Sequence, residues 1–372
     1  MSGTGRAAPG GWRRALRGAG IAGGAVSAVA AAVYAAQRAV VANDRSRPDP
    51  DAGTALRPRF DEARRVPSHD GGGIHTISAG SGPTLVLSHG VTLSSRLWVK
   101  QFDHLPVRGL RVVAYDHRGH GESEPGESGH TLANLAADVR TVLEELDLRD
   151  VVLVGHSMGG VAVMAFAIEH PDVAAARVHG LVLMSTLATT HVSLSRRLRC
   201  GLQQAWDRGP DIVGLMRQRN LGFLLARIGF GRDPQPSHVE MTREMIAATT
   251  HESSRPAISV LLALDLTGDL SKIVLPTLVL SGSADLIAPP AESRRIAELI
   301  PGARLEVFEG AGHMLMLERT EEVDDLLADF VREVGAREPG VEASASRRWP
   351  RRRVAGRRRG PLARRRTPRR TE

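Results

Sequence analysis

Cysteine is nearly absent from this chain of 372 residues, because Cys200 is its only one. A single thiol excludes an internal disulfide and any zinc site built from several cysteines. Lysine is also rare, whereas arginine, alanine and glycine are abundant, a bias that we attribute to base composition and not to function. The lack of disulfides does not fix the compartment, since many exported proteins also have none.

A net positive charge is missing from the central part of the chain. The formal net charge is +8, yet residues 347–372 hold 13 Arg with one Glu, and residues 1–47 hold seven Arg with one Asp. Residues 48–346 therefore carry a formal charge of −10. A nucleic-acid-binding domain needs positive charge on the folded surface that meets the phosphates, so we expect no specific nucleic acid as partner. The Arg-rich tail can still contact polyanions or anionic lipids without specificity.

Residues 18–37 have no charged side chain and lie between Arg17 and Arg38. Their length, about 20 residues, is what a helix needs to cross a bilayer, although most of them are alanine and glycine. Three interpretations are open: a membrane anchor, a cleaved export signal, or an alanine-rich helix that stays in water. We therefore expect a membrane-associated or exported protein, with a cytoplasmic one as the alternative.

Short apolar runs alternate with amphipathic helical stretches such as 131–147 through most of the chain. This alternation predicts an α/β fold with a mostly parallel central sheet flanked by helices, and it fails between residues 187 and 270. The strand-like runs lie at 84–88, 111–115, 151–154, 178–184, 277–281 and 304–308. The expected parts are a basic N-terminal segment (1–47), a linker (48–61), a core (62–186 and 271–335), an inserted helical region (187–270) and a disordered Arg-rich tail (336–372).

The strongest motif is Gly155-His156-Ser157-Met158-Gly159, between the strand-like run 151–154 and the helical run 161–169. It matches the Gly-x-Ser-x-Gly turn in the context that gives the motif its meaning. Small residues let neighbouring elements approach a sharp turn, and the hydroxyl of Ser157 then projects at the carboxyl end of the sheet. We expect Ser157 to be a nucleophile, with His156 in a supporting role.

A serine at its ordinary pKa needs a base, and the base needs an acid that orients it. In the chain order Ser, Asp, His, both partners follow the nucleophile. Among the later histidines, only His313 lies in a glycine-flanked loop directly after a strand-like run. Asp285 directly follows the run 277–281, whereas Asp265 and Asp269 lie nearer the inserted region and fit less well. We therefore expect Ser157, Asp285 and His313 to be catalytic.

An acyl-transfer site also needs donors for the oxyanion. The N–H that follows the nucleophile, on Met158, supplies one. The second is expected from the loop after the run 84–88, where Gly90 permits a turn and Val91 carries the candidate N–H. We expect His89 to support this loop and not to carry a proton.

Four blocks, in this order and spacing, make the chain similar to the α/β-hydrolase superfamily over roughly residues 62–335, with an N-terminal segment like that of some actinobacterial hydrolases. They are His89-Gly90 with Trp98; the turn Asp116-His117-Arg118-Gly119-His120-Gly121-Glu122-Ser123; the elbow around Ser157; and Gly282-x-x-Asp285 with Gly310-x-Gly312-His313. The resemblance implies the α/β-hydrolase fold and makes residues 187–270 a helical cap over the active site. It implies neither a cofactor nor a metal. His117 and His120 have the spacing of a metal pair but lie inside the turn block, so we expect them to be structural.

The residue at the elbow narrows the chemistry that the resemblance implies. Epoxide hydrolases and haloalkane dehalogenases of this superfamily use aspartate there, and epoxide hydrolases also need cap tyrosines. Here the elbow residue is Ser157, and the two tyrosines, Tyr34 and Tyr115, lie outside the cap. Both features exclude an epoxide hydrolase.

Carboxylesterases, monoacylglycerol-type lipases, cofactor-free perhydrolases (non-haem haloperoxidases) and carbon–carbon bond hydrolases share a Ser–His–Asp set. Thr92 stands where many perhydrolase-like relatives have proline, which favours an esterase. We expect a serine hydrolase that cleaves a small, apolar carboxylic ester through an acyl-serine. The alternatives are a perhydrolase or carbon–carbon bond hydrolase with the same residues, or a binding protein that has kept the fold without turnover.

Overall fold

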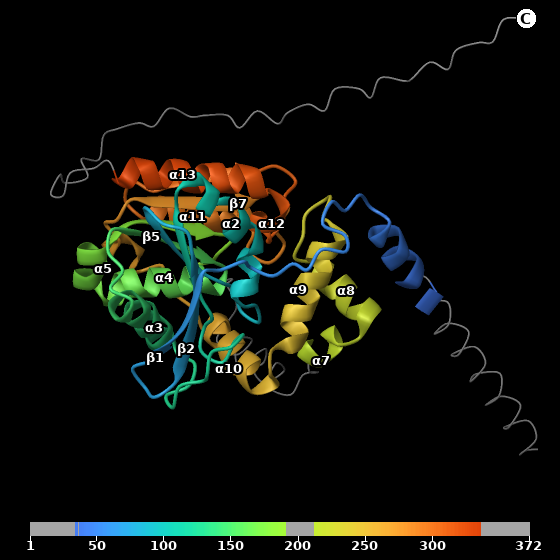
Figure 1. The fold of residues 1–372 in the computed structure, drawn as a ribbon, viewed down its shortest axis with the longest axis horizontal. Coiled ribbons are helices and arrows are strands. Elements are labelled where there is room, and N and C mark those ends of the chain that lie inside the picture. The colour runs from blue at the N-terminus through green and yellow to red at the C-terminus, as the bar shows by residue number, and fades with distance from the viewer. Residues whose placement is uncertain (1–33, 36, 191–211, 336–372) are drawn as a thin grey trace, which may run out of the picture. The chain divides into compact units, whose positions relative to one another are not determined.

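A single sheet of eight strands forms the centre of the computed structural model, which describes residues 34–35, 37–190 and 212–335 (Figure 1). The strand order is β1-β2-β4-β3-β5-β6-β7-β8. Strands β1 and β2 pair in antiparallel fashion, as do β2 and β4, and all other neighbours are parallel. The mostly parallel sheet expected from the sequence is confirmed. The strands are β1 (Glu62–Pro67), β2 (Gly73–Ala79), β3 (Thr84–Ser88), β4 (Arg111–Tyr115), β5 (Val151–His156), β6 (Val178–Met184), β7 (Thr277–Gly282) and β8 (Arg304–Phe308).

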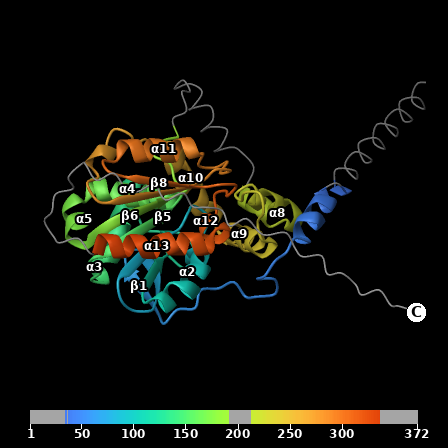
Figure 2. The ribbon, with the colours of Figure 1, turned by 90° about the horizontal axis from the view of Figure 1, so that it is seen from above.

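Helices cover both faces of the sheet (Figures 1 and 2). Residues of α2 and α13 pack with one set of strand side chains, and residues of α3, α4 and α11 pack with the alternate set. Because both faces are covered, the central strands are apolar throughout, and all six residues of β5 are buried. These helices are α2 (Val99–His104), α3 (Leu132–Glu145), α4 (Met158–Glu169), α5 (Pro171–Arg177), α11 (Pro290–Leu299), α12 (Leu315–Glu318) and α13 (Thr320–Gly335), with short 3-10 turns η1 (Ser95–Trp98), η2 (Pro106–Arg108) and η3 (Leu270–Lys272).

Four helices lie between β6 and β7 in the described part of this insertion: α7 (Ile212–Met216), α8 (Arg219–Arg227), α9 (Pro236–Ala248) and α10 (His251–Leu262). They fall within the region 187–270 that the resemblance makes a cap, although 191–211 lie outside the described residues. Buried side chains of α8 and α9, among them Phe223 and Val239, join the same apolar cluster as Leu56 and Leu97. The insertion therefore packs against the region that precedes β1 and against the segment that follows β3.

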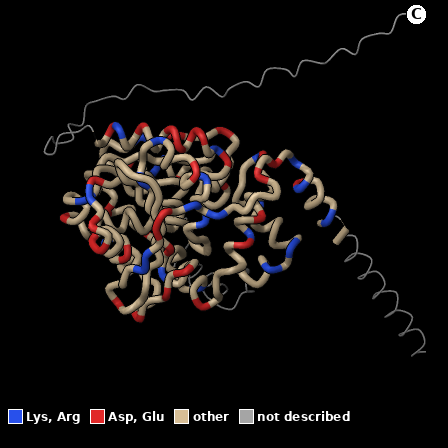
Figure 3. Tube along the Cα trace, viewed as in Figure 1, with Lys and Arg blue, Asp and Glu red and all other residues tan. Residues whose placement is uncertain are grey.

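The N-terminal segment is helical over residues 37–45. The candidate membrane helix at 18–37 lies almost wholly outside the described residues, and so does the Arg-rich tail at 336–372. Within the described ranges, no helix has both the length and the apolar character needed to cross a membrane. Figure 3 shows basic and acidic residues interspersed along the described trace, with acidic residues frequent on α13.

Candidate active site

Ser157 occupies the turn between β5 and α4 with φ 54° and ψ −119°. Residues other than glycine rarely adopt this backbone conformation. Close packing holds this geometry: a Cβ on Gly159 would lie 2.2 Å from the carbonyl oxygen of Ser88, so only glycine fits there. The N–H of Ser157 donates to the Met184 carbonyl (3.1 Å), and the Thr186 hydroxyl donates to the Ser157 carbonyl (2.7 Å). The sharp turn that the motif predicts is thus built by strands β3 and β6 on either side.

The loops after β7 and β8 bring Asp285 and His313 together. The two side chains are buried, and His313 Nδ1 lies 2.9 Å from Asp285 Oδ2. The other carboxylate oxygen accepts the N–H groups of Ile287 and Ala288, each at 2.8 Å. Since a carboxylate oxygen accepts hydrogen bonds, Nδ1 of His313 is the donor in this contact, and Nε2 is the ring nitrogen that does not contact Asp285.

His313 also lies against the elbow. The His156 side chain donates from Nε2 to the His313 carbonyl (3.0 Å), and the two imidazole rings are 4.7 Å apart. Burial, together with the neighbouring His313, holds the pKa of His156 well below its usual value, so His156 is a neutral donor. No hydrogen bond joins the Ser157 hydroxyl to His313 among the described residues; such contacts are often long in sites without substrate.

The loop after β3 also runs beside Ser157. A Cβ on Gly90 would lie 3.2 Å from Ser157 Cβ, so the Gly90 backbone runs directly beside the elbow. His89 donates from Nδ1 to the Gly90 carbonyl (2.7 Å) and accepts the His117 N–H at Nε2 (3.0 Å). Burial lowers the pKa of His89, which keeps the ring neutral in this bridging role. The predicted donor residues are Val91, which follows Gly90, and Met158, which begins α4, and they therefore belong to the two chain segments that meet here.

Sequence reasoning missed two side chains that hold this site. Glu318, at the end of α12, accepts the N–H groups of Gly312 (3.0 Å) and Met314 (3.2 Å), the two neighbours of His313, and that of Gly231 in the insertion (2.7 Å). Burial raises the pKa of its carboxyl group, although these backbone hydrogen bonds oppose the rise. Thr186 is the second missed residue. Neither has a motif, because both act through tertiary contacts that only the folded chain creates.

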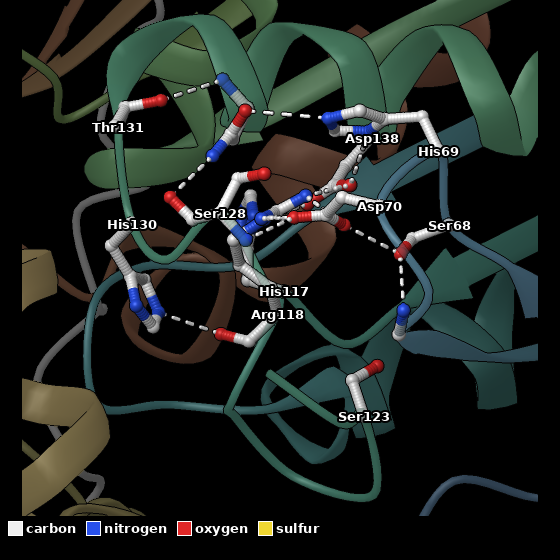
Figure 4. Close-up of polar contacts among 12 residues, drawn as sticks. Ser68, His69, Asp70, His117, Arg118, Ser123, Ser128, His130, Thr131 and Asp138 are labelled. Atoms are coloured by element: carbon white, nitrogen blue, oxygen red, sulfur yellow. Dashed lines mark hydrogen bonds and ion pairs between the residues drawn. The ribbon is translucent and has the colours of Figure 1, made fainter. Parts of the chain in front are cut away.

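The turn block after β4 contains a buried arginine that joins it to helix α3 and to the segment between β1 and β2 (Figure 4). Arg118 forms a bidentate pair with Asp138 at 2.7 Å for both contacts, and it also contacts Asp70 at 2.9 Å. Burial opposes ionisation of Asp70, but hydrogen bonds from Arg118, Ser68 and the Ser128 N–H outweigh it and lower the pKa of Asp70. This network fixes the chain between β4 and α3.

The histidines of the turn block make structural contacts. His117 Nε2 is 2.9 Å from the Ser88 hydroxyl, and His120 Nδ1 donates to the Arg118 carbonyl (2.9 Å). Burial lowers the pKa of both rings, that of His120 to about 3. Within the residues that the structure describes, no group of three or more histidine, cysteine, aspartate or glutamate side chains is placed to hold a metal ion.

Comparison with known proteins identifies the family of this chain. The profile of the alpha/beta hydrolase family matches residues 85–326. A non-haem haloperoxidase from Rhodococcus erythropolis is 32% identical over 272 residues, which are 72% of this chain and 98% of the relative.

Two solved structures are similar as well. An esterase from Exiguobacterium antarcticum has a TM-score of 0.65 at 24% identity, covering 73% of this chain and 100% of that one, and shares the fold. A thermophilic esterase from Thermogutta terrifontis has a TM-score of 0.61 at 27% identity, covering 73% of this chain and 99% of the other. The chain is therefore a member of the alpha/beta hydrolase family.

Proposed function

We propose that the protein is a serine hydrolase that cleaves a carboxylic ester. The observation that carries this proposal is the hydrogen bond from His313 to Asp285, placed against an elbow that forces Ser157 into a positive φ. A histidine held by an acid beside a strained serine is the arrangement that activates a hydroxyl for attack on a carbonyl.

In the proposed reaction, the Ser157 hydroxyl attacks the ester carbonyl while His313 Nε2 takes its proton. Asp285 stabilises the resulting imidazolium, and the N–H groups of Val91 and Met158 stabilise the oxyanion. The protonated His313 then gives its proton to the departing alcohol, which leaves an acyl-serine. Water, deprotonated by His313, attacks this ester and releases the acid.

Apolar side chains near the base favour an apolar substrate. Leu286 and Ile287, directly after Asp285, are 75% and 50% exposed, and Ile228 at the end of α8 is 50% exposed. Ile287 reaches Gly229, whose carbonyl accepts the His313 N–H at 2.9 Å. We call Ile228, Leu286 and Ile287 the apolar rim. Large apolar groups beside a reacting centre contribute binding energy to an apolar acyl or alcohol group.

A perhydrolase is the second candidate, because the Rhodococcus relative is named a haloperoxidase. In that chemistry, hydrogen peroxide replaces water in the attack on the acyl-serine and a peracid leaves. The backbone at Thr92 favours the ester hydrolase, since its φ of 59° is closed to proline, whose ring holds φ near −65°. The loop that carries Val91 therefore differs in conformation from one with proline at this position.

The first experiment is covalent labelling with a fluorophosphonate probe. The wild-type protein is expected to be labelled, and Ser157→Ala is expected to lose the label while keeping its melting temperature. A folded wild-type protein that takes no label would contradict the proposal and favour a binding protein without turnover.

The second experiment separates the two chemistries. Hydrolysis of p-nitrophenyl esters of graded chain length is measured beside peracid formation from the free acid and hydrogen peroxide. Ester turnover that exceeds peracid formation by at least about a hundredfold, roughly 3 kcal/mol in the barrier, supports the esterase. Comparable rates would identify a perhydrolase.

A further inference from the structure

Residues 49–56, which we call the strap, connect the cap helix α9 with the core. Asp49 accepts the N–H of Ser237 (2.7 Å) and its hydroxyl (2.8 Å) at the start of α9. Asp51 lies 2.8 Å from the buried ring of His238 and 2.6 Å from the ammonium group of Lys100 on α2. The strap therefore ties the first turn of α9 to α2. This helix follows the loop 89–94, which carries Val91 and which we call the oxyanion loop.

The middle of α9 is held by the same segment of the core. Arg96, in the turn η1 between the oxyanion loop and α2, pairs with Glu244 on α9 at 2.9 Å. The same guanidinium donates to the carbonyl of Leu56 in the strap at 2.8 Å. One arginine thus joins the strap, the cap helix and the segment after β3.

The far end of α9 touches the oxyanion loop itself. Thr249, directly after the last residue of α9, donates from its hydroxyl to the Thr92 carbonyl (3.1 Å). Both residues are buried, and Thr92 has the positive φ that a β-branched residue adopts only under constraint. The carbonyl that Thr249 holds is one residue beyond Val91, whose N–H is the proposed oxyanion donor.

We propose that the strap and α9 act as a brace that positions the Val91 N–H, with Thr249 as a positioning residue for the reaction. The inference rests on the proposed ester hydrolysis and extends it to the strap, which lies outside the family match that begins at residue 85. An oxyanion donor acts only when it lies about 3 Å from the developing charge, so a small shift of the loop costs rate. The strap fixes α9 at its start, and Thr249 transmits that position to the loop at its end.

The first test compares three variants. Thr249→Val removes the hydroxyl at nearly constant volume and is expected to lower kcat for p-nitrophenyl esters about five- to tenfold, with KM little changed, because one buried hydrogen bond is lost. Thr249→Ser keeps the hydroxyl and is expected to retain most of the activity. Thr242→Val is the matched control, since Thr242 is buried on the same helix and donates to the His238 carbonyl (2.9 Å) without touching the loop.

The second test concerns the strap. The double variant Asp49→Asn/Asp51→Asn is expected to lower kcat by a similar factor, whereas Asp61→Asn, which contacts Gly80 outside the strap, is expected to leave kcat unchanged. Adding Thr249→Val to the strap variant is expected to produce little further loss, because both changes act through the position of the same loop. If Thr249→Val fails to fold, the strap double variant and its Asp61→Asn control still test the brace.

The outcomes separate the two proposals. Failure of the wild-type protein to take the fluorophosphonate label defeats the ester hydrolase itself. A labelled and active wild-type protein whose Thr249→Val and strap variants turn over at the wild-type kcat overturns the brace alone. Equal losses of kcat in Thr249→Val and Thr242→Val would likewise overturn it, since they would reduce Thr249 to a stabiliser of α9.

Discussion

The elbow around Ser157 and the contact between the strap and α9 are held by different kinds of interaction. At the elbow, backbone meets backbone: Gly159 packs against the carbonyl of Ser88 at a separation that leaves no room for a side chain. Between the strap and α9, carboxylates meet hydroxyl, imidazole and ammonium groups. The difference teaches that close backbone packing shapes the turn at Ser157, whereas charged and polar side chains hold the strap against α9.

The largest effect is expected where shape decides. Gly159→Ala places a Cβ 2.2 Å from the Ser88 carbonyl oxygen, so strand β3 or helix α4 must shift. We expect the free energy of unfolding to fall by about 3 kcal/mol, measured by urea titration. Gly268→Ala is the control, because nothing lies within 4 Å of the added Cβ there. Equal stability of the two variants would contradict close backbone packing at the elbow.

The buried ion pair between Arg118 and Asp70 tests whether the charge of a side chain makes the stability of the fold depend on pH. Asp70→Asn weakens the contact with Arg118, and we expect a loss of about 2 kcal/mol of unfolding free energy at pH 7. The pKa of Asp70 is lowered in the folded state, so its contribution is complete above about pH 4 and declines as the pH falls further.

The difference between wild type and Asp70→Asn should therefore shrink below about pH 4 in unfolding titrations. The exposed Asp103→Asn is the control and should change little at any pH. A difference that stays constant down to pH 2 would mean that Asp70 stabilises the fold through packing and not through its charge.

Glu318 tests whether charged hydrogen bonds hold the loop that carries His313. Glu318→Gln keeps the size of the side chain but weakens its charge-assisted hydrogen bonds to the two neighbours of His313 and to Gly231. We expect kcat/KM for p-nitrophenyl esters to fall about tenfold, or roughly 1.4 kcal/mol of barrier. Glu321→Gln, exposed at the start of α13, should leave kcat/KM unchanged. Equal activity of both variants would show that shape alone places His313.

The smallest effect is expected at the apolar rim, because its exposed side chains are held neither by close packing nor by charged partners. Ile287→Ala should lower kcat/KM for long-chain p-nitrophenyl esters about three- to fivefold and leave the acetate unchanged. Val274→Ala removes an exposed apolar side chain before β7 and serves as the control. A uniform loss across chain lengths would instead assign Ile287 to the support of Asp285.

The two kinds of interaction also explain what the sequence could predict. Strands β3, β4, β6 and β8 were predicted with their exact bounds. The first three lie inside the sheet and are almost wholly buried, so their sequences are mostly apolar, whereas β8 lies at the sheet edge and is only partly buried. Asp285 and His313 were brought to the same sheet edge by their places after β7 and β8, and the structure places them in contact. Their catalytic roles remain proposals that the labelling and kinetic experiments test.

Other residues left no trace in the sequence. Thr186 and Thr249 each reach a backbone carbonyl of a segment far away in the chain, and Glu318 joins the distant Gly231 to the loop that carries His313. No spacing rule marks such residues. The strap lies within residues 48–61, which were interpreted as a linker because the prolines and aspartates of this part of the chain are typical of one. A position where close backbone packing admits only glycine can be recognised as part of a sequence motif. A polar side chain that contacts a distant segment cannot be recognised in this way.

The hydrogen bond from His156 to the His313 carbonyl joins positions 157 residues apart, which has a consequence for biogenesis. A nascent chain that has emerged only as far as β6 already contains the whole elbow segment. It has no base, because β7 and β8, whose loops supply Asp285 and His313, are not yet made. If the proposed chemistry is correct, the serine stays unreactive throughout synthesis and gains its reactivity only when the last strands of the sheet are added.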